Sequence, residues 1–283
     1  RFMDKYCDSK CVFYKNKNFQ PEIKNATEME KDFAEYIRND YASKSFDMRS
    51  IYKSATSNWK VVPGDLVIIY GNTGVGKSSF TQNLVYKSGL NTLFLSLEVT
   101  AHLTFRRFIQ MAHSMTKDEV LKHYKKHDDS LHKAIDKIRV MSVAPTLESI
   151  EMIVASEMPK PEILVIDTTD ELVVPFVNSE IDKQNKIANS LKTLAQKQGI
   201  IIIAVHHLSK EASKNPTQLT VHSGKGSSSI PQKADKVMAV LGYDNAPERV
   251  IQSMKSRDES NFSLPMMFDY KTYTFKERLP NGK

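Results

Sequence analysis

The chain has 283 residues, with 40 Lys or Arg against 33 Asp or Glu and a formal charge of +7. Apolar residues make up 40% of it, which is enough for the core of one large α/β domain. No apolar run reaches membrane-spanning length and no signal peptide opens the chain, so we expect a soluble, cytoplasmic protein without a membrane partner. Two cysteines, Cys7 and Cys11, exclude a disulfide framework or a four-cysteine zinc site. The basic charge favours a polyanionic partner without identifying one.

The N-terminal part is expected to be an arm followed by a helix. Residues 1–26 show no periodicity, whereas Thr27 to Glu30 match a capping box and apolar residues then recur at helical spacing over about 28–42. The apolar stripe of this helix packs either on its own domain or on a neighbouring subunit. We predict an N-terminal arm and linker helix at 1–49 and one large domain at 50–283. Because the chain begins at Arg1, we expect it to be a fragment of something longer.

The large domain opens with a short apolar run, Leu66 to Tyr70, typical of a buried parallel strand. Residues 71–78 follow at once and fit G-x-x-x-x-G-K-[ST], the phosphate-binding loop, between a strand and a helix. Lys77 is expected to reach the β- and γ-phosphates of ATP, or of another ribo- or deoxyribonucleoside triphosphate, and Ser78 to hold Mg²⁺. The predicted nucleotide-binding residues are Gly71, Asn72, Thr73, Gly74, Val75, Gly76, Lys77, Ser78 and Ser79.

Two later apolar runs end in a carboxylate. Glu98 follows the run at 92–97, and Asp167 ends the run at 162–167. A carboxylate at the carboxyl end of a parallel strand is well placed for chemistry, and in phosphate-loop proteins such an aspartate orients Mg²⁺. Asp170 and Glu171 follow closely and are interpreted as loop carboxylates rather than metal ligands.

The remaining pattern alternates helices and strands. Residues 101–137 are expected to be helical; His123 and His127 share a face there, but without the His-Glu-x-x-His zinc pattern we interpret this region as a solvated helix. Further helices are predicted up to 158 and at 180–198. Strands are predicted at 138–143, 200–205, 236–241, 249–254, 264–269 and 272–276. This order predicts an α/β fold with a mostly parallel central sheet flanked by helices.

A long segment between 206 and 236 contains five lysines, two glycines and three consecutive serines. It is either a binding element or a disordered connection.

These motifs together resemble the RecA-like motor of DnaB-like replicative helicases, as in phage primase-helicases, over roughly residues 50–277. The resemblance implies that Glu98, in Ser-Leu-Glu, activates the attacking water. It also implies that His207, in Ala-Val-His-His-Leu, contacts the γ-phosphate, with His206 the weaker candidate. Lys255 and Arg257 resemble the Lys-x-Arg pair that reaches a neighbour's nucleotide. The implied DNA-binding residues are Lys210, Lys214, Gly224, Lys225, Gly226 and Ser227.

The resemblance further implies an ATP-hydrolysing ring, expected to be a homohexamer, that moves along single-stranded DNA in a bacterial or phage-infected cell. A primase or polymerase domain would then belong to sequence upstream of this chain. The alternative is a RecA-like or KaiC-like nucleotide-gated oligomer that binds DNA without unwinding it. A phosphate-loop kinase of small molecules is the third possibility, although no acceptor pocket or lid is recognised in the sequence.

Overall fold

The computed structural model describes residues 24–55, 58–126, 130–209, 212, 219–225, 229–244 and 246–278. The chain divides into two compact units, Arg1–Ala42 and Ser43–Lys283. The division falls before the boundary predicted at residue 49, because Phe46 and Met48 lie in the hydrophobic core of the second unit.

The first unit contains the predicted amphipathic helix, α2 (Ala26–Tyr36), which continues as one π-helical turn, η2 (Ile37–Tyr41). Its cap was predicted wrongly. The side chain of Asn25, not Thr27, accepts the Glu28 backbone N–H at 3.0 Å, and the Glu28 carboxylate accepts the Asn25 N–H at 2.8 Å. The capping pattern occurs twice in this stretch, and the helix begins at the earlier one, which leaves Thr27 inside the helix.

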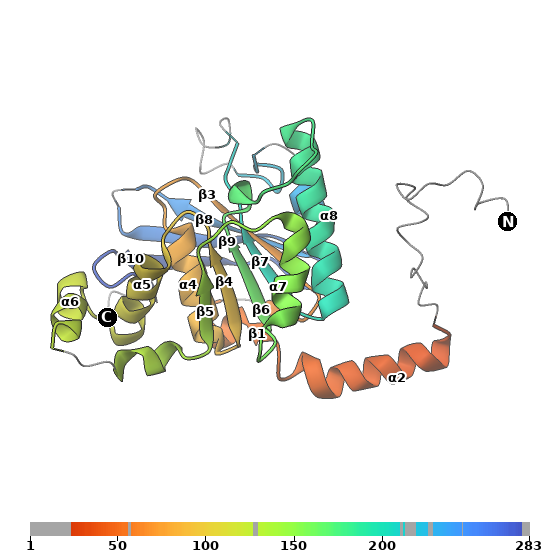
Figure 1. Cartoon of the computed structure of the whole chain (residues 1–283), viewed down its shortest axis with the longest axis horizontal. Helices are drawn as coiled ribbons and strands as arrows, with labels where there is room; N and C mark the ends of the chain where they lie inside the picture. The colour runs from red at the N-terminus through yellow and green to blue at the C-terminus, as the bar shows by residue number, and fades with distance from the viewer. Residues whose placement is uncertain are drawn as a thin grey trace. The chain divides into compact units, whose positions relative to one another are not determined.

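A nine-stranded sheet forms the centre of the second unit, in the order β11-β10-β9-β8-β3-β7-β6-β4-β5 (Figure 1). The strands from β8 to β5 pair in parallel, and β9, β10 and β11 extend the sheet antiparallel. This confirms the predicted α/β class with a mostly parallel sheet. The strands are β3 (Leu66–Gly71), β4 (Thr92–Ser96), β5 (Ile138–Met141), β6 (Ile163–Asp167), β7 (Ile201–Val205), β8 (Lys236–Gly242), β9 (Glu248–Ser256), β10 (Ser263–Asp269) and β11 (Thr274–Glu277).

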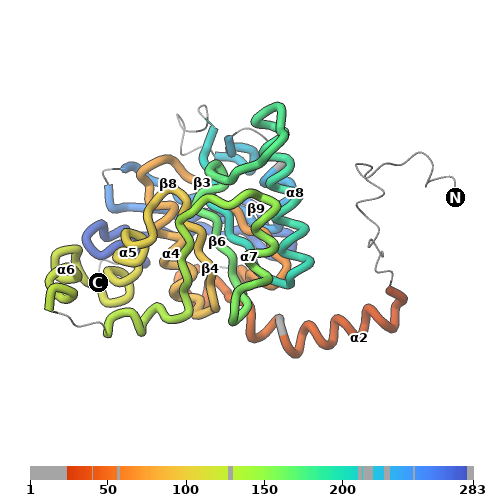
Figure 2. The backbone as a smooth tube through the Cα atoms, in the orientation of Figure 1, coloured from red at the N-terminus to blue at the C-terminus, as the bar shows by residue number. Residues whose placement is uncertain are grey.

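Helices cover both faces of the sheet (Figures 1 and 2). The predicted helix at 101–137 is interrupted after α5, where Ser114 adopts a left-handed φ of 53°. In the described residues no helix is long and apolar enough to cross a membrane. The helical elements are α4 (Lys77–Ser88), α5 (Ala101–His113), α6 (Lys117–Tyr124), η3 (Ser130–Ile135), η4 (Leu147–Ser149), α7 (Ile150–Ser156), η5 (Thr169–Glu171), α8 (Glu180–Gln198) and α10 (Ser229–Lys233).

The sheet separates two hydrophobic cores. Val67 and Ile69 of β3 face the core formed with α4 and α5, whereas Leu66, Ile68 and Tyr70 face the core formed with α7 and α8. Successive side chains of a strand point to opposite faces, so a run that is apolar at every position suits a strand covered on both sides. The two helical layers therefore hold β3, and the loop that follows it, in a fixed position.

Residues 43–63 are more structured than the connection that the sequence predicted. They form a small sheet of β1 (Phe46–Asp47) and β2 (Lys60–Val61), with the short helix α3 (Met48–Ile51) between them. Trp59 is fully buried with its ring 5.4 Å from that of Phe262. Burial of such large side chains stabilises the segment against the main core.

Candidate nucleotide site

The carboxyl ends of β3, β4, β6 and β7 meet at one edge of the sheet. Ser96 of β4 pairs with Asp167 of β6, Asp167 pairs with Val205 of β7, and Val205 pairs with Ile69 of β3. Parallel strands bring the residues that follow them to the same edge, and ligands of open α/β sheets bind there. The phosphate-binding loop, Glu98, Asp167 and His207 are therefore neighbours although they are distant in sequence.

The phosphate-binding loop turns through two left-handed glycines, Gly74 with φ 84° and Gly76 with φ 92°. A Cβ atom at Gly74 would lie 2.3 Å from an Asp244 carboxylate oxygen, so glycine is required by space as well as by φ. Lys77 begins α4 and is 7% exposed, with Nζ donating to the Asn72 carbonyl at 2.9 Å. Burial lowers the pKa of Lys77. A triphosphate replacing the carbonyl would give this ammonium an anionic partner.

A cavity of about 320 Å³ opens above this loop. Its lining combines residues predicted for the nucleotide with others that the sequence did not single out. They are Thr73, Gly74, Gly76, Lys77, Ser78, Ser79, Glu98, Val99, Arg107, Thr168, His207, Phe268, Tyr270 and Tyr273.

Ser78 and Asp167 make contact at the base of the cavity, where Ser78 Oγ donates to Asp167 Oδ1 at 3.0 Å. Asp167 is 4% exposed, and burial raises its pKa to about 6. A buried carboxylate beside a hydroxyl is an oxygen donor set that fits Mg²⁺, which phosphate-loop sites hold with few protein ligands besides the phosphates. In the part of the chain that the structure describes, no group of three or more His, Cys, Asp or Glu could hold a metal by itself.

Glu98 and His207 lie side by side at the mouth of the cavity. Glu98 Oε1 is 2.9 Å from His207 Nε2, and it also accepts the Thr168 hydroxyl at 3.1 Å. The hydrogen bond from His207 lowers the pKa of Glu98, against the opposing effect of burial. Glu98 is therefore ionised at neutral pH, as a group that accepts a proton must be.

His206, by contrast, faces away from Glu98. Its side chain is fully buried, with Nδ1 2.8 Å from Thr169 Oγ1 and Nε2 3.0 Å from the Lys225 carbonyl.

Arg107 and three aromatic residues were missed by the sequence reasoning. The Arg107 guanidinium lies 5.0 Å from the centre of the Tyr273 ring, and its Nε is buried without a hydrogen-bond partner in the described residues. Arg107 belongs to the helix that starts directly after Glu98, which is the only sequence signal that could have pointed to it. Phe268, Tyr270 and Tyr273 come from the C-terminal strands and carried no recognisable motif.

Arg249 is a second missed residue. It is 2% exposed, and its Nε donates to the Val75 carbonyl of the phosphate-binding loop at 2.7 Å. Its other nitrogens donate to the carbonyls of Ala246 and Glu248 and to the Tyr270 hydroxyl. The β8–β9 turn and Tyr270 are thereby fastened to the loop.

Lys255 and Arg257 lie far from this loop in the same chain. They flank Ser256, which pairs with Lys236 at the start of β8, whereas Val240 of β8 pairs with Gly71. Four residues of strand separate the two levels, about 13 Å. Lys255 Nζ donates to the carbonyls of Pro231, Gln232 and Ala234, and Arg257 Nε lies 3.3 Å from Asp235 Oδ1.

Two of the predicted DNA-binding residues, Gly224 and Lys225, lie in the described residues; Lys210, Lys214, Gly226 and Ser227 lie outside them, as do Cys7, Cys11 and His127. The Lys225 side chain is exposed, and its backbone N–H donates to the His207 carbonyl at 2.9 Å.

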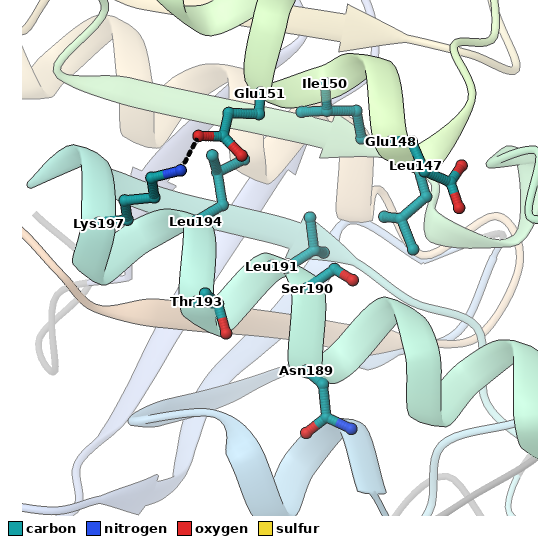
Figure 3. Close-up of a pocket in the computed structure, with 10 residues that line it drawn as sticks. All are labelled: Leu147, Glu148, Ile150, Glu151, Asn189, Ser190, Leu191, Thr193, Leu194 and Lys197. Carbon is teal, nitrogen blue, oxygen red and sulfur yellow. Dashed lines mark ion pairs between the residues drawn. The ribbon is translucent and has the colours of Figure 1, made fainter. Parts of the chain in front are cut away.

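A separate cavity of about 290 Å³ lies between α7 and α8 (Figure 3). The ion pair of Lys197 and Glu151, with Nζ 2.5 Å from Oε1, crosses it. It shares no lining residue with the cavity above the phosphate-binding loop and contains none of the predicted site residues.

The fold is shared with solved helicase domains. One of them, solved as an isolated ATPase domain, superimposes with a TM-score of 0.67 at 18% identity, covering 77% of this chain and 86% of that one. A DnaB-like replicative helicase, solved in a study of its interactions with primase, gives a TM-score of 0.72 at 16% identity over 90% of this chain and 69% of that one. The expected resemblance to DnaB-like replicative helicases is thus confirmed at the level of the fold.

A relative in sequence is the DNA repair protein RadA of Listeria monocytogenes, 24% identical over 200 residues. The match covers 70% of this chain but only 37% of that protein, so the chain spans little more than a third of the relative's length. The family model of the AAA domain (AAA_25) matches residues 57–213, more than half of the chain, and includes the phosphate-binding loop, Glu98, Asp167 and His207. The chain therefore belongs to the AAA domain family and carries a P-loop NTPase domain.

Proposed function

We propose that this chain is the motor domain of a ring-shaped ATPase, a homohexamer, that moves along single-stranded DNA and unwinds duplex at a replication fork. We further propose that it works in the cytoplasm of a bacterial or phage-infected cell, with 1–49 as arm and linker and 50–283 as motor. The P-loop NTPase domain and the helicase-like fold support this proposal.

In the proposed reaction ATP binds with its β- and γ-phosphates on the loop at 71–78. Lys77 exchanges its hydrogen bond with the Asn72 carbonyl for one with phosphate. Mg²⁺ held by Ser78 and Asp167 would neutralise phosphate charge. Glu98 accepts a proton from the attacking water, while His207 orients the Glu98 carboxylate and faces the γ-phosphate.

One observation carries the assignment of a DNA motor. The His207 side chain contacts Glu98, and the His207 backbone carbonyl accepts the N–H of Lys225 in the basic segment. A group that responds to the γ-phosphate is therefore one hydrogen bond from a lysine that faces solvent. Lysines meet phosphates of a nucleic acid without reading its bases, which suits movement along any sequence.

Arg257 and Lys255 are proposed to serve the nucleotide of the next subunit. Their distance from the phosphate-binding loop of their own chain supports an action in trans. A ring is the closed form of such a head-to-tail contact. Arg257 must leave Asp235 to act, and a guanidinium at the γ-phosphate then stabilises the charge that develops during transfer.

A second candidate is a DNA-binding ATPase oligomer of the repair type that does not unwind a fork, which the sequence match to RadA favours. Strand displacement separates the two. We expect the chain, with ATP and Mg²⁺, to release the labelled strand of a forked duplex, and the Glu98→Gln variant to release none. DNA-stimulated ATP hydrolysis without strand release would favour the second candidate. Hydrolysis that ignores DNA would contradict both.

A further inference from the structure

His206 is a buried titratable group that the proposed reaction does not use. It occupies the carboxyl end of β7, one residue before His207, and each of its ring nitrogens has one partner. Nδ1 faces the Thr169 hydroxyl and Nε2 faces the Lys225 carbonyl. The two partners belong to different parts of the site, since Thr169 follows β6 and Lys225 lies in the basic segment.

The partners fix the tautomer of the ring. A carbonyl can only accept a hydrogen bond, so Nε2 carries the proton and donates to Lys225. Burial lowers the pKa of His206, so the ring is neutral and Nδ1 accepts from the Thr169 hydroxyl. A neutral ring with one donor and one acceptor matches the two partners in one orientation only.

On the β6 side, His206 is joined to the groups of the nucleotide site. Thr169 directly follows Thr168, whose hydroxyl donates to Glu98, and Thr168 directly follows Asp167. Movement of this short stretch on nucleotide binding would therefore displace the Thr169 hydroxyl.

On the other side, His206 contacts the basic segment closely. A Cβ atom at Gly224 would lie 2.6 Å from the Tyr70 hydroxyl oxygen and 3.0 Å from His206 Cδ2, so this backbone packs directly on both rings. Leu208 forms a bridge with Gly224, and the Ser209 N–H donates to the Ser223 carbonyl at 2.9 Å. Lys225 Nζ also lies 3.6 Å from Asp170 Oδ2. With so little free space, a shift of His206 must move Gly224 and Lys225.

We propose that His206 is a positioning residue that couples the nucleotide site to the DNA-binding segment, by holding the Lys225 backbone in register with Thr169. The inference rests on the proposed function, because it assigns the residue through which DNA binding and ATP hydrolysis influence each other. Such coupling is reciprocal, so nucleotide should change the affinity for DNA by the factor by which DNA changes the affinity for nucleotide.

The test measures coupling rather than activity alone. ATP turnover is measured with and without saturating oligo(dT), and the dissociation constant of labelled oligo(dT) is measured with and without a non-hydrolysable ATP analogue. His206→Leu removes both hydrogen bonds. His206→Gln keeps a side-chain N–H donor near the position of Nε2. His222→Gln is the matched control, because His222 is exposed in the same segment.

We expect His206→Leu to reduce DNA stimulation about tenfold, and to reduce the effect of the analogue on DNA affinity by a similar factor. Its basal turnover should fall much less. His206→Gln should retain most of the coupling, and His222→Gln all of it. If His206→Leu does not fold, Thr169→Val tests the same link by removing the hydroxyl that donates to Nδ1, with Thr169→Ser as its rescue.

The two possible failures are distinct. If DNA does not stimulate the unmodified chain, the proposed function is wrong and this inference with it. If DNA stimulates the unmodified chain and both His206→Leu and Thr169→Val respond as strongly, the proposed function stands and His206 does not couple the sites.

Discussion

Glu98 Oε1 lies 2.9 Å from His207 Nε2, although 109 positions separate the two residues in sequence. The contact joins the end of β4 to the end of β7 across the mouth of the nucleotide cavity. It lowers the pKa of Glu98 and holds the carboxylate where it faces the phosphate-binding loop. A base and its orienting partner are thus assembled before any substrate binds.

This arrangement predicts that Glu98→Gln lowers ATP turnover by about 10² to 10⁴-fold, because the amide keeps the shape of the side chain but cannot accept a proton. Nucleotide binding should persist. Lys77→Ala, in contrast, should lose both binding and turnover, because it removes the ammonium that meets the phosphates. Phosphate release and binding of a fluorescent nucleotide check the two variants. Glu171→Gln, at an exposed carboxylate close by, is the control. Parental turnover in Glu98→Gln would mean that the base is another residue.

Asp167 predicts a pH dependence of stability. Burial raises its pKa to about 6 from 3.8, so the folded state holds the proton more tightly than the unfolded state. The unfolding free energy therefore falls as the pH rises from about 4 to about 6, by ~3 kcal/mol from this group alone. Asp167→Asn should be more stable than the parent by that amount at pH 7 and equally stable near pH 3.

Urea unfolding without nucleotide or divalent cations measures this difference. Burial also raises the pKa of Asp65 to about 6, but that group is common to both proteins and cancels in the comparison. An Asp167→Asn variant that is less stable than the parent at pH 7 would show that the carboxylate stabilises the empty site.

Lys225 predicts a change in the salt dependence of DNA binding. Lys225→Ala should weaken binding of single-stranded DNA about equally for all sequences and reduce the slope of log K against log salt by about 1. Fluorescence anisotropy at several salt concentrations gives the slope. Lys122→Ala, which removes an exposed lysine of α6, is the control for net charge. An unchanged slope in an intact oligomer would make the basic segment a simple connection.

Arg257 predicts complementation between subunits. Arg257→Ala and Glu98→Gln should each bind ATP and hydrolyse it poorly. In randomly mixed rings about a quarter of the interfaces would combine an intact Glu98 with an intact Arg257 from the neighbour. Those interfaces should regain hydrolysis, measured in a single turnover after subunit exchange has been verified. Recovery absent under those conditions would exclude an action in trans.

The sequence by itself determined the parts of the protein that depend on local pattern. The strand at 66–70, the phosphate-binding loop and the start of α4 follow from neighbouring residues, because the turn needs its glycines and the strand is apolar on both faces. The same holds for Asp167 at the end of β6, and the strand order of an α/β sheet is limited by the alternation of elements. Where a pattern occurs twice, as at Asn25 and Thr27, the sequence could not choose the cap.

The tertiary structure decided which distant residues share the site. Arg107, Tyr270 and Arg249 carry no motif, and they reach the phosphate-binding loop only because α5 and the C-terminal strands pack beside it. Adjacent histidines also face different partners: His207 contacts Glu98, while His206 is buried between Thr169 and Lys225. Both are the same residue type at the end of one strand. Only the packing around β7 assigns one to the nucleotide cavity and the other to the interior, because successive side chains of an extended chain point in opposite directions.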